Sequence, residues 1–492
     1  MLLTSASSSG LQRSSTSTSS SQPLIGRVAG DVLQLPVAGG EAFRTATQRC
    51  RPQLEGGPLL PKLQRSGAWP GSEPSRGSNT TVVTTLHVDR LHLLEAHCAV
   101  WPHTIVAAVY APVSATRRLV CLSEGNGGGE LARRRGSFLS WLGLGGSCTY
   151  SGWSVDRLKR LVRSTHRRAQ KTGQCNLEVS FWTERVGAEL GAAAGLLPQA
   201  ALQNRALLAL GPEDASEHSA VVLLDSDMVS VDIWQLVNWP TRWARALREM
   251  SAGKALVLPA FQLTPGGVAA AAARGEAVGL AAMRDALEVA TAGTKGRTRA
   301  GKIADSCGAR CAVKLIMKLE QFAEAGKFPL KQLYAEGRAT VYSDHGFASS
   351  QSAALPELWF EAGDMHGDPD DGYPVAPQPG FAPFTMMLQR HVPWADERLR
   401  GSYYQRAWQA LACRAMGLQH VVQPNSFSLQ LPHDGGYSRG EAALKNFLQL
   451  EPVLRQLVEE VGRGAYVPVT SFGDSNICKQ RDAPAVAPAH DE

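Results

Sequence analysis

The chain has 492 residues, of which 44% are apolar, and a formal net charge of +6. This length suits two or three average domains, or one large enzyme domain with appendages. The small net positive charge argues against a dedicated nucleic-acid binder, for which basic residues interleaved with stacking aromatic residues are typical. No apolar run reaches the roughly 18 residues that a membrane-spanning helix needs, so no membrane anchor is visible.

Residues 1–78 are rich in Ser, Gly, Pro and Arg, and no acidic residue precedes Asp31. Such a composition cannot bury enough apolar surface to fold, so it predicts a disordered N-terminal region. A Ser-rich, acid-poor start is also typical of an organelle transit peptide. A plastid location is therefore one alternative for this chain.

An ordered domain is expected over residues 79–465. Apolar periodicity predicts a strand–helix–strand opening, which is the start of an α/β layer. A Gly-rich insertion interrupts the domain at 124–150. The predicted elements before residue 225 are strands at 80–88, 104–113, 176–182 and 220–224 and helices at 89–101, 154–170 and 198–210.

The second half of the domain is predicted with the same patterns. One strand is expected over 254–263, a long irregular loop over 364–383, and a strand pair, or a strand and loop, over 420–431. The predicted helices lie at 276–291, 309–325, 330–335, 402–416 and 438–462. Residues 466–492 are predicted to be a flexible tail.

Two acids, Asp225 and Asp227, follow the apolar run at 220–224. Burying an unpaired carboxylate is costly, so the pair calls for a cation. Hard carboxylate oxygens suit Mg²⁺ or Mn²⁺, which can bridge the phosphates of a nucleotide. The strand would place both acids at the carboxyl end of a central strand, where open α/β sheets bind ligands.

The same residues also fit a haloacid-dehalogenase-type phosphatase, with Asp225 as nucleophile and Asp227 as acid and base. The run "GDPDD" at 367–371 offers a further acidic pair, although a solvated turn is the ordinary interpretation of such a segment. Against this alternative, about 140 residues of predicted ordered structure precede Asp225, whereas such domains normally begin at the strand that carries the nucleophile.

The chain as a whole resembles glycosyltransferase family 49, which contains LARGE-type and β-1,4-glucuronyltransferase-type enzymes. Six segments match that family in order over most of residues 80–460. They are "VVTTLHVDRLHLLEAHCAVW" with "IVAAVYAPV", "LPQAALQNRALLAL", "VVLLDSDMVS", "ALVLPAFQ", "FAPFTMMLQRHVPWADERLRG" and "HVVQPNSFSLQLPH".

The resemblance implies a GT-A-type nucleotide-sugar transferase fold that uses Mn²⁺ (or Mg²⁺), a UDP-sugar donor and a glycan acceptor. Asp225 and Asp227 take the metal positions, and His433 matches the final histidine of the closing motif, which would be the third ligand. A neutral imidazole is a sound partner for two carboxylates around such an ion. Without the resemblance, His433 would be an ordinary surface histidine.

Inversion at the anomeric carbon needs a base that removes the proton of the acceptor hydroxyl. Asp396 and Glu397 are the candidates, and a cap for the helix at 402–416 is their structural alternative. The family pattern also places Asn204 and Asp225 at the nucleotide sugar. Arg390 and Arg398 are candidates for binding the diphosphate or an acidic sugar, or else form structural ion pairs.

Several positions depart from the family pattern, among them Gln203, Gln262 and Gln430. These departures put the donor sugar, which is glucuronate in well-known members, in question. A catalytically inactive homologue that only binds glycans is therefore a third interpretation. Family members are Golgi membrane proteins, so a Golgi location is expected by resemblance.

Overall fold

The computed structural model describes the chain in segments. They are residues 51–52, 60–71, 80–114, 154–172, 175–186, 196–210, 219–231, 233–263, 327–337, 339–342, 351, 354–362, 372–375, 381–401, 404–430, 450, 452–453, 455–457, 459–461, 463 and 466–471. The helices predicted at 276–291 and 309–325, the Gly-rich insertion at 124–150 and most of the helix at 438–462 lie outside these segments.

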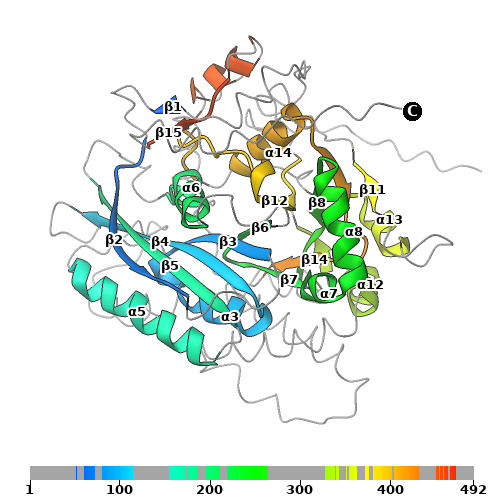
Figure 1. Ribbon diagram of the computed structural model, residues 1–492, viewed down its shortest axis with the longest axis horizontal. Coiled ribbons are helices and arrows are strands. Elements are labelled where there is room, and N and C mark those ends of the chain that lie inside the picture. The colour runs from blue at the N-terminus through cyan, green and yellow to red at the C-terminus, as the bar shows by residue number, and fades with distance from the viewer. Residues whose placement is uncertain are drawn as a thin grey trace, which may run out of the picture.

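The fold is α/β, built on a mixed sheet that has nine strands within the described residues. Its strand order is β11-β13-β8-β12-β6-β3-β4-β5-β2 (Figure 1). The bounds are β2 Leu63–Trp69, β3 Thr80–His87, β4 Thr104–Ser114, β5 Asn176–Val186, β6 Ala220–Asp225, β8 Lys254–Leu258, β11 Tyr373–Pro374, β12 Phe384–Leu388 and β13 Gln419–Val422.

Four neighbouring strands, β5, β4, β3 and β6, run parallel. The chain moves outward from β3 to β4 and β5 and then returns to the other side of β3 to form β6. The strand order thus reverses between β3 and β6. Such a reversal is a topological switch point, and ligands of open α/β sheets bind there, at the carboxyl ends of the strands.

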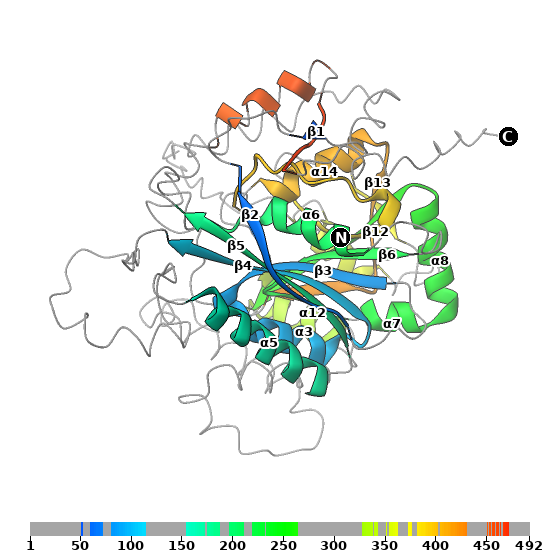
Figure 2. The ribbon, with the colours of Figure 1, turned by 60° about the vertical axis from the view of Figure 1, so that its left-hand side comes forward.

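Helices cover both faces of this sheet, which explains why β6 is a continuous apolar run. One face packs against α3 (His92–Val100), α5 (Val155–Thr172), α7 (Ile233–Asn238) and α8 (Pro240–Ser251). The other face packs against α6 (Gln199–Ala209) and α14 (Gln405–Ala415). Figure 2 shows α3 and α5 below the strands and α6 and α14 above them.

A second sheet of four described strands has the order β10-β9-β14-β7. The strands are β7 Met228–Val231, β9 Ala260–Leu263, β10 Ala339–Val341 and β14 Phe427–Gln430. Helices α12 (Lys327–Ala335) and α13 (Pro356–Glu361) pack against it through an aromatic cluster that includes Phe261, Trp359 and Phe427. Since β7 follows β6 after two residues, the second sheet begins beside the acidic pair.

The structure differs from the sequence-based expectation over residues 254–263, where one strand was predicted. Two strands form instead, β8 in the large sheet and β9 in the small one, and Pro259 separates them. Proline donates no backbone hydrogen bond, so a ladder readily ends there. The predicted strand pair at 420–431 is likewise split, because β13 joins the large sheet and β14 the small one.

Three further strands, β1 (Arg51–Pro52), β2 and β15 (Val469–Thr470), lie in segments that composition predicts to be unstructured. β2 pairs with β5 although it falls within residues 1–78, and β15 pairs with β1 although it falls in the predicted tail. Long-range pairing supplies the order that these short segments cannot generate alone.

Cys98 on α3 and Cys175, just before β5, form a disulfide with a Cα–Cα distance of 5.0 Å. Both residues are buried, and they tie α3 to the strand that follows α5. Within the described residues, no helix is long and apolar enough to cross a bilayer.

Candidate functional site

Asp225 and Asp227 lie where the two sheets meet. Asp225 ends β6, Ser226 and Asp227 form the turn, and β7 begins at Met228. The apolar residues of β6 are held between β3 and β12, which fixes the turn at the carboxyl end of a central strand. The sequence-based placement of the pair at this strand end is confirmed.

Side chains from three distant elements hold the two carboxylates. Gln199 on α6 donates Nε2–H to Oδ1 of Asp225 at 2.7 Å, and the Arg406 guanidinium lies 3.2 Å from Oδ2. Gln430, at the end of β14, donates Nε2–H to Oδ2 of Asp227 at 3.3 Å. Each acid therefore has a defined orientation before any ligand binds.

The environment raises the pKa of Asp225 above that of an exposed aspartate. Burial raises the pKa of its carboxyl group, and the negative charge of Asp227 adds to the effect. The charges of Arg406 and Arg90 and the hydrogen bond from Gln199 oppose it, but the net direction is upward. Two carboxylates this close repel each other, so a bound cation would relieve the repulsion.

The turn between the acids is anchored from the opposite side of the sheet. Nε2 of His97 on α3 lies 2.8 Å from the carbonyl oxygen of Ser226, to which it donates. Burial lowers the pKa of His97, which keeps the ring neutral near pH 7. This bond fixes the backbone between Asp225 and Asp227.

A pocket opens beside Asp225 at the switch point between β3 and β6. Its cavity volume is about 20 Å³, which is room for about one water molecule and well below the range of small-molecule sites. Its lining comes from both strands and from α6 and α14. The described lining residues are Val83, Thr84, Thr85, Gln199, Gln203, Leu223, Leu224, Asp225, Pro383, Arg406 and Gln409.

Three of these side chains carry a buried polar atom without a hydrogen-bond partner: Oγ1 of Thr84 and the Nε2 atoms of Gln203 and Gln409. Buried polar groups are normally paired, so each open group calls for a ligand or water. Amide N–H groups and a hydroxyl are suited to the hydroxyl or carbonyl oxygens of a neutral polar group.

The donor set at Asp225 and Asp227 fits a hard divalent ion, since it offers carboxylate oxygens at a strand end. Among the described residues, however, no group of three or more His, Cys, Asp or Glu side chains could hold a metal ion. The predicted third ligand, His433, lies outside the described residues. Its role stays a prediction.

Gln430 is the last described residue before His433 in the sequence. Gln430 contacts Asp227 and pairs with Met228 in the β14–β7 ladder. The described part of this segment therefore ends beside the acidic pair.

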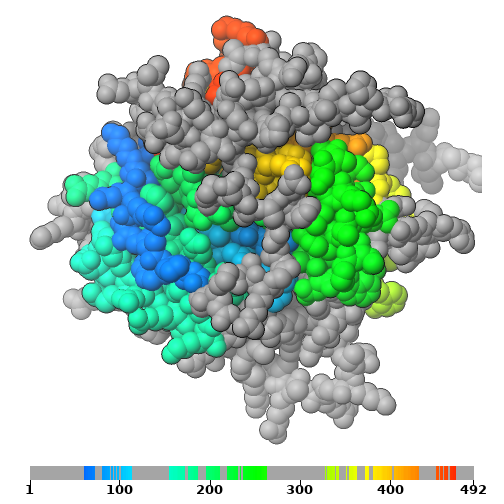
Figure 3. All heavy atoms as spheres, in the orientation of Figure 1, coloured from blue at the N-terminus to red at the C-terminus, as the bar shows by residue number. Residues whose placement is uncertain are grey.

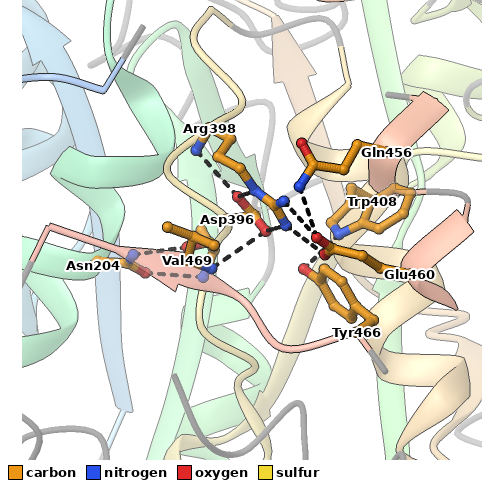
Figure 4. A network of polar contacts seen from close by, with 9 residues as sticks. Asn204, Asp396, Arg398, Trp408, Gln456, Glu460, Tyr466 and Val469 are labelled. Atoms are coloured by element: carbon orange, nitrogen blue, oxygen red, sulfur yellow. Dashed lines mark hydrogen bonds and ion pairs between the residues drawn. The ribbon is translucent and has the colours of Figure 1, made fainter. Parts of the chain in front are cut away.

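Asp396 and Glu397, the predicted catalytic bases, contact the C-terminal segment, and Figure 4 shows Asp396 beside Val469. Asp396 accepts two bonds from the guanidinium of Arg398, at 2.9 and 2.7 Å, one from the backbone N–H of Arg398 at 3.1 Å and one from that of Val469 at 3.3 Å. Glu397 accepts from Asn204 at 3.1 Å and from the N–H of Ser471 at 2.9 Å. Both acids are only 1% exposed, so an acceptor hydroxyl could reach either only if residues 466–471 moved away. Neither caps α14, which has no side-chain cap.

Asn204 and Arg398, predicted to bind the nucleotide sugar, take part in the same network. Asn204 is fully buried and exchanges hydrogen bonds with the backbone of Ala395 at 2.8 and 2.9 Å. Arg398 joins Asp396 to Glu460, with guanidinium–carboxylate distances of 2.7 and 2.9 Å. Their contacts here are those of structural anchors.

Arg390 lies apart from these residues, on the short 3₁₀ helix η7 (Gln389–His391). It is half-buried, and its Nε lies 3.4 Å from Nε2 of His391. The described contacts of Arg390 do not test whether it binds a diphosphate, so this role stays a prediction.

Sequence reasoning missed Gln199, Gln409 and His97 as site residues. Each of these residues lies on a helix. The apolar pattern of the sequence predicts the helix, but it does not indicate which polar side chain of the helix faces the site. The departures Gln203 and Gln430 were the available signal, because both stand at positions expected to shape a ligand pocket. The structure places Gln203 in the pocket lining and Gln430 against Asp227.

Comparison of the chain with protein-family models and with curated proteins gives no significant match.

Proposed function

We propose that the chain is a metal-dependent, inverting glycosyltransferase of GT-A type, which transfers a sugar from a UDP-sugar to a glycan acceptor. The observation that carries the proposal is the position of Asp225 and Asp227. They end a central parallel strand at a topological switch point, beside a pocket with unpaired polar groups. The ordered resemblance of six sequence segments to family 49 supports the same function.

In this proposal Asp225, Asp227 and His433 hold Mn²⁺ or Mg²⁺, which when bound neutralises the diphosphate leaving group. Gln199 and Gln430 orient the two carboxylates through their amide N–H groups. Thr84, Gln203 and Gln409 offer hydrogen bonds to a neutral part of the donor, such as sugar hydroxyls or a base carbonyl. Asp396 and Glu397 stay the candidate bases, subject to displacement of the segment that covers them.

We place the enzyme in an oxidising lumen, as the Golgi location of the family suggests. The Cys98–Cys175 disulfide supports this assignment, because disulfides persist in secretory compartments and are rare where thiols are kept reduced. The plastid alternative rests only on the composition of the N-terminal region.

The test is hydrolysis of a panel of UDP-sugars by the purified full chain, with and without Mn²⁺. We expect Mn²⁺-dependent release of UDP from at least one sugar nucleotide, and its loss in D225N and D227N. The matched control is D156N, which removes an exposed acid on α5.

Two other outcomes would replace the proposal. Rapid turnover of an aryl phosphate without hydrolysis of any UDP-sugar would favour the phosphatase. No turnover of a UDP-sugar or of the aryl phosphate, together with binding to a glycan, would favour the inactive homologue.

A further inference from the structure

Helix α5 presents a row of basic side chains to solvent. Arg160, Arg163, Arg167 and Lys171 are exposed and recur at intervals of three and four residues. This spacing places them on one face of a helix, along about 17 Å. We call these four residues the basic stripe.

The opposite side of α5 anchors the helix on the domain. Leu158, Val162, Thr165 and Ala169 are buried in the layer that covers one face of the large sheet. The stripe is therefore held on a rigid element. Figure 3 shows the α5 segment at the molecular surface, at the lower left.

Few acids neutralise the stripe. Glu95 on α3 lies 2.7 Å from Arg168, outside the stripe, and Asp156 is the one acid of α5 itself. The four stripe side chains have no hydrogen-bond or ion-pair partner within the part of the chain that the structure describes. Their positive charge is thus available to a ligand.

The chemistry of the exposed side chains on α5 indicates which class of ligand could bind there. All of them are charged or polar. Besides the basic stripe they are Asp156, Arg157, Ser164 and Arg168. Without an exposed apolar or aromatic side chain, the helix cannot insert into a bilayer or stack on nucleotide bases. What it offers is a line of cations, mostly planar guanidinium groups that bind carboxylate and sulfate in a fork geometry.

The Cys98–Cys175 disulfide narrows the classes of anionic ligand that the basic stripe could meet. Cys98 and Cys175 lie in the same layer as α5, and their bond indicates maturation in an oxidising compartment. Nucleic acids are not ligands there, and the strongly anionic lipid surface is that of the cytoplasmic leaflet. Linear polyanions in such compartments are acidic polysaccharides.

We propose that the basic stripe binds an acidic polysaccharide, of the sulfated or uronate-rich class, as a surface separate from the candidate active site. The two sites lie on different sides of the large sheet, since α5 covers one face and α6 and α14, which line the pocket, cover the other (Figures 1 and 2). Binding at the stripe does not depend on the proposed sugar transfer.

The test measures the affinity of the full chain for heparin and polygalacturonate, with dextran as the neutral polymer, at a series of salt concentrations. We expect salt-sensitive binding to the acidic polymers only. The variant R160E/R163E/R167E should bind at least about tenfold more weakly.

The matched control is R248E/K331E/R414E, which reverses three exposed cations scattered over α8, α12 and α14. It has the same net charge as the stripe variant and should retain binding. If the stripe variant fails to fold, as judged by circular dichroism, R160Q/R163Q/R167Q replaces it.

Equal binding by the stripe and control variants would overturn the proposal. So would tighter binding of the unaltered chain to anionic phospholipid vesicles or single-stranded DNA than to either acidic polymer. Failure of UDP-sugar hydrolysis would leave the polysaccharide result unaffected.

Discussion

The guanidinium of Arg406 lies 3.2 Å from Oδ2 of Asp225. It also stacks on Phe384, at 4.3 Å from the ring centroid, and bonds the Tyr342 hydroxyl at 3.4 Å. Arg406 therefore occupies one oxygen of a carboxylate that is proposed to hold a divalent ion. An arginine and a metal ion compete for the same negative charge.

Replacing Arg406 by glutamine should tighten Mn²⁺ binding by roughly tenfold, because the ion would no longer face a neighbouring cation. Binding can be measured by electron paramagnetic resonance of free Mn²⁺. R414Q removes an exposed arginine from the same helix and should leave the affinity unchanged. Unchanged or weaker binding in R406Q would show that Arg406 does not oppose the ion.

Mn²⁺ should dissociate on acidification at a higher pH than from an ordinary aspartate. Burial raises the pKa of Asp225, and the charge of Asp227 raises it further, so a proton competes with the ion sooner. Arg406 lowers that pKa, so R406Q should raise the proton affinity of Asp225 as well as its affinity for the ion. A Mn²⁺ titration of the unaltered chain at a series of pH values measures the midpoint of release. A midpoint within the ordinary aspartate range, near about 4, would contradict the expectation.

The sequence predicted the strands and helices from 80 to 225 because each is long and its apolar residues recur with one clear period. It did not predict the break at Pro259, since a single apolar run concealed two strands of different sheets. It also did not predict β2 or β15. Their order comes from pairing with β5 and β1, which local pattern does not encode.

The acidic pair could be placed from sequence because a buried strand ends at Asp225. The partners of the pair could not, since Arg406 and Gln199 come from distant helices whose polar positions carry no local signal. The motif that suggested a catalytic role for Asp396 and Glu397 likewise could not reveal that the chain returns at Val469 and Ser471 to cover them.

Removing the Cys98–Cys175 disulfide should lower the free energy of unfolding by about 2–5 kcal/mol, because the bond closes a long loop, with a sequence separation of 77. Urea denaturation of C98A/C175A measures the loss. C413A, which alters a buried free thiol, is the control and should cost less. Mass spectrometry of non-reduced peptides checks the pairing directly. Equal stability of the double variant and the unaltered chain would argue against a structural bridge.

The network around Asp396 leads to the last prediction. Burial alone would lower the pKa of Arg398, but its bonds to Asp396 and Glu460 raise it above the ordinary value, so the guanidinium stays charged. D396N should therefore leave Arg398 with Glu460 as its carboxylate partner, weaken the buried hydrogen bonds at residue 396 and destabilise the fold by about 3 kcal/mol. R398Q should cause a similar loss, and the double variant should lose less than the sum, because both changes break one interaction.

Urea denaturation of the three variants measures this coupling, and limited proteolysis near residue 470 reports release of the C-terminal segment. Mn²⁺ affinity is the internal control and should not change. A catalytic base would behave differently: D396N would abolish sugar transfer while the free energy of unfolding stayed unchanged, and R398Q would not reproduce its effect. That combination would return Asp396 to the reaction and require residues 466–471 to open during turnover.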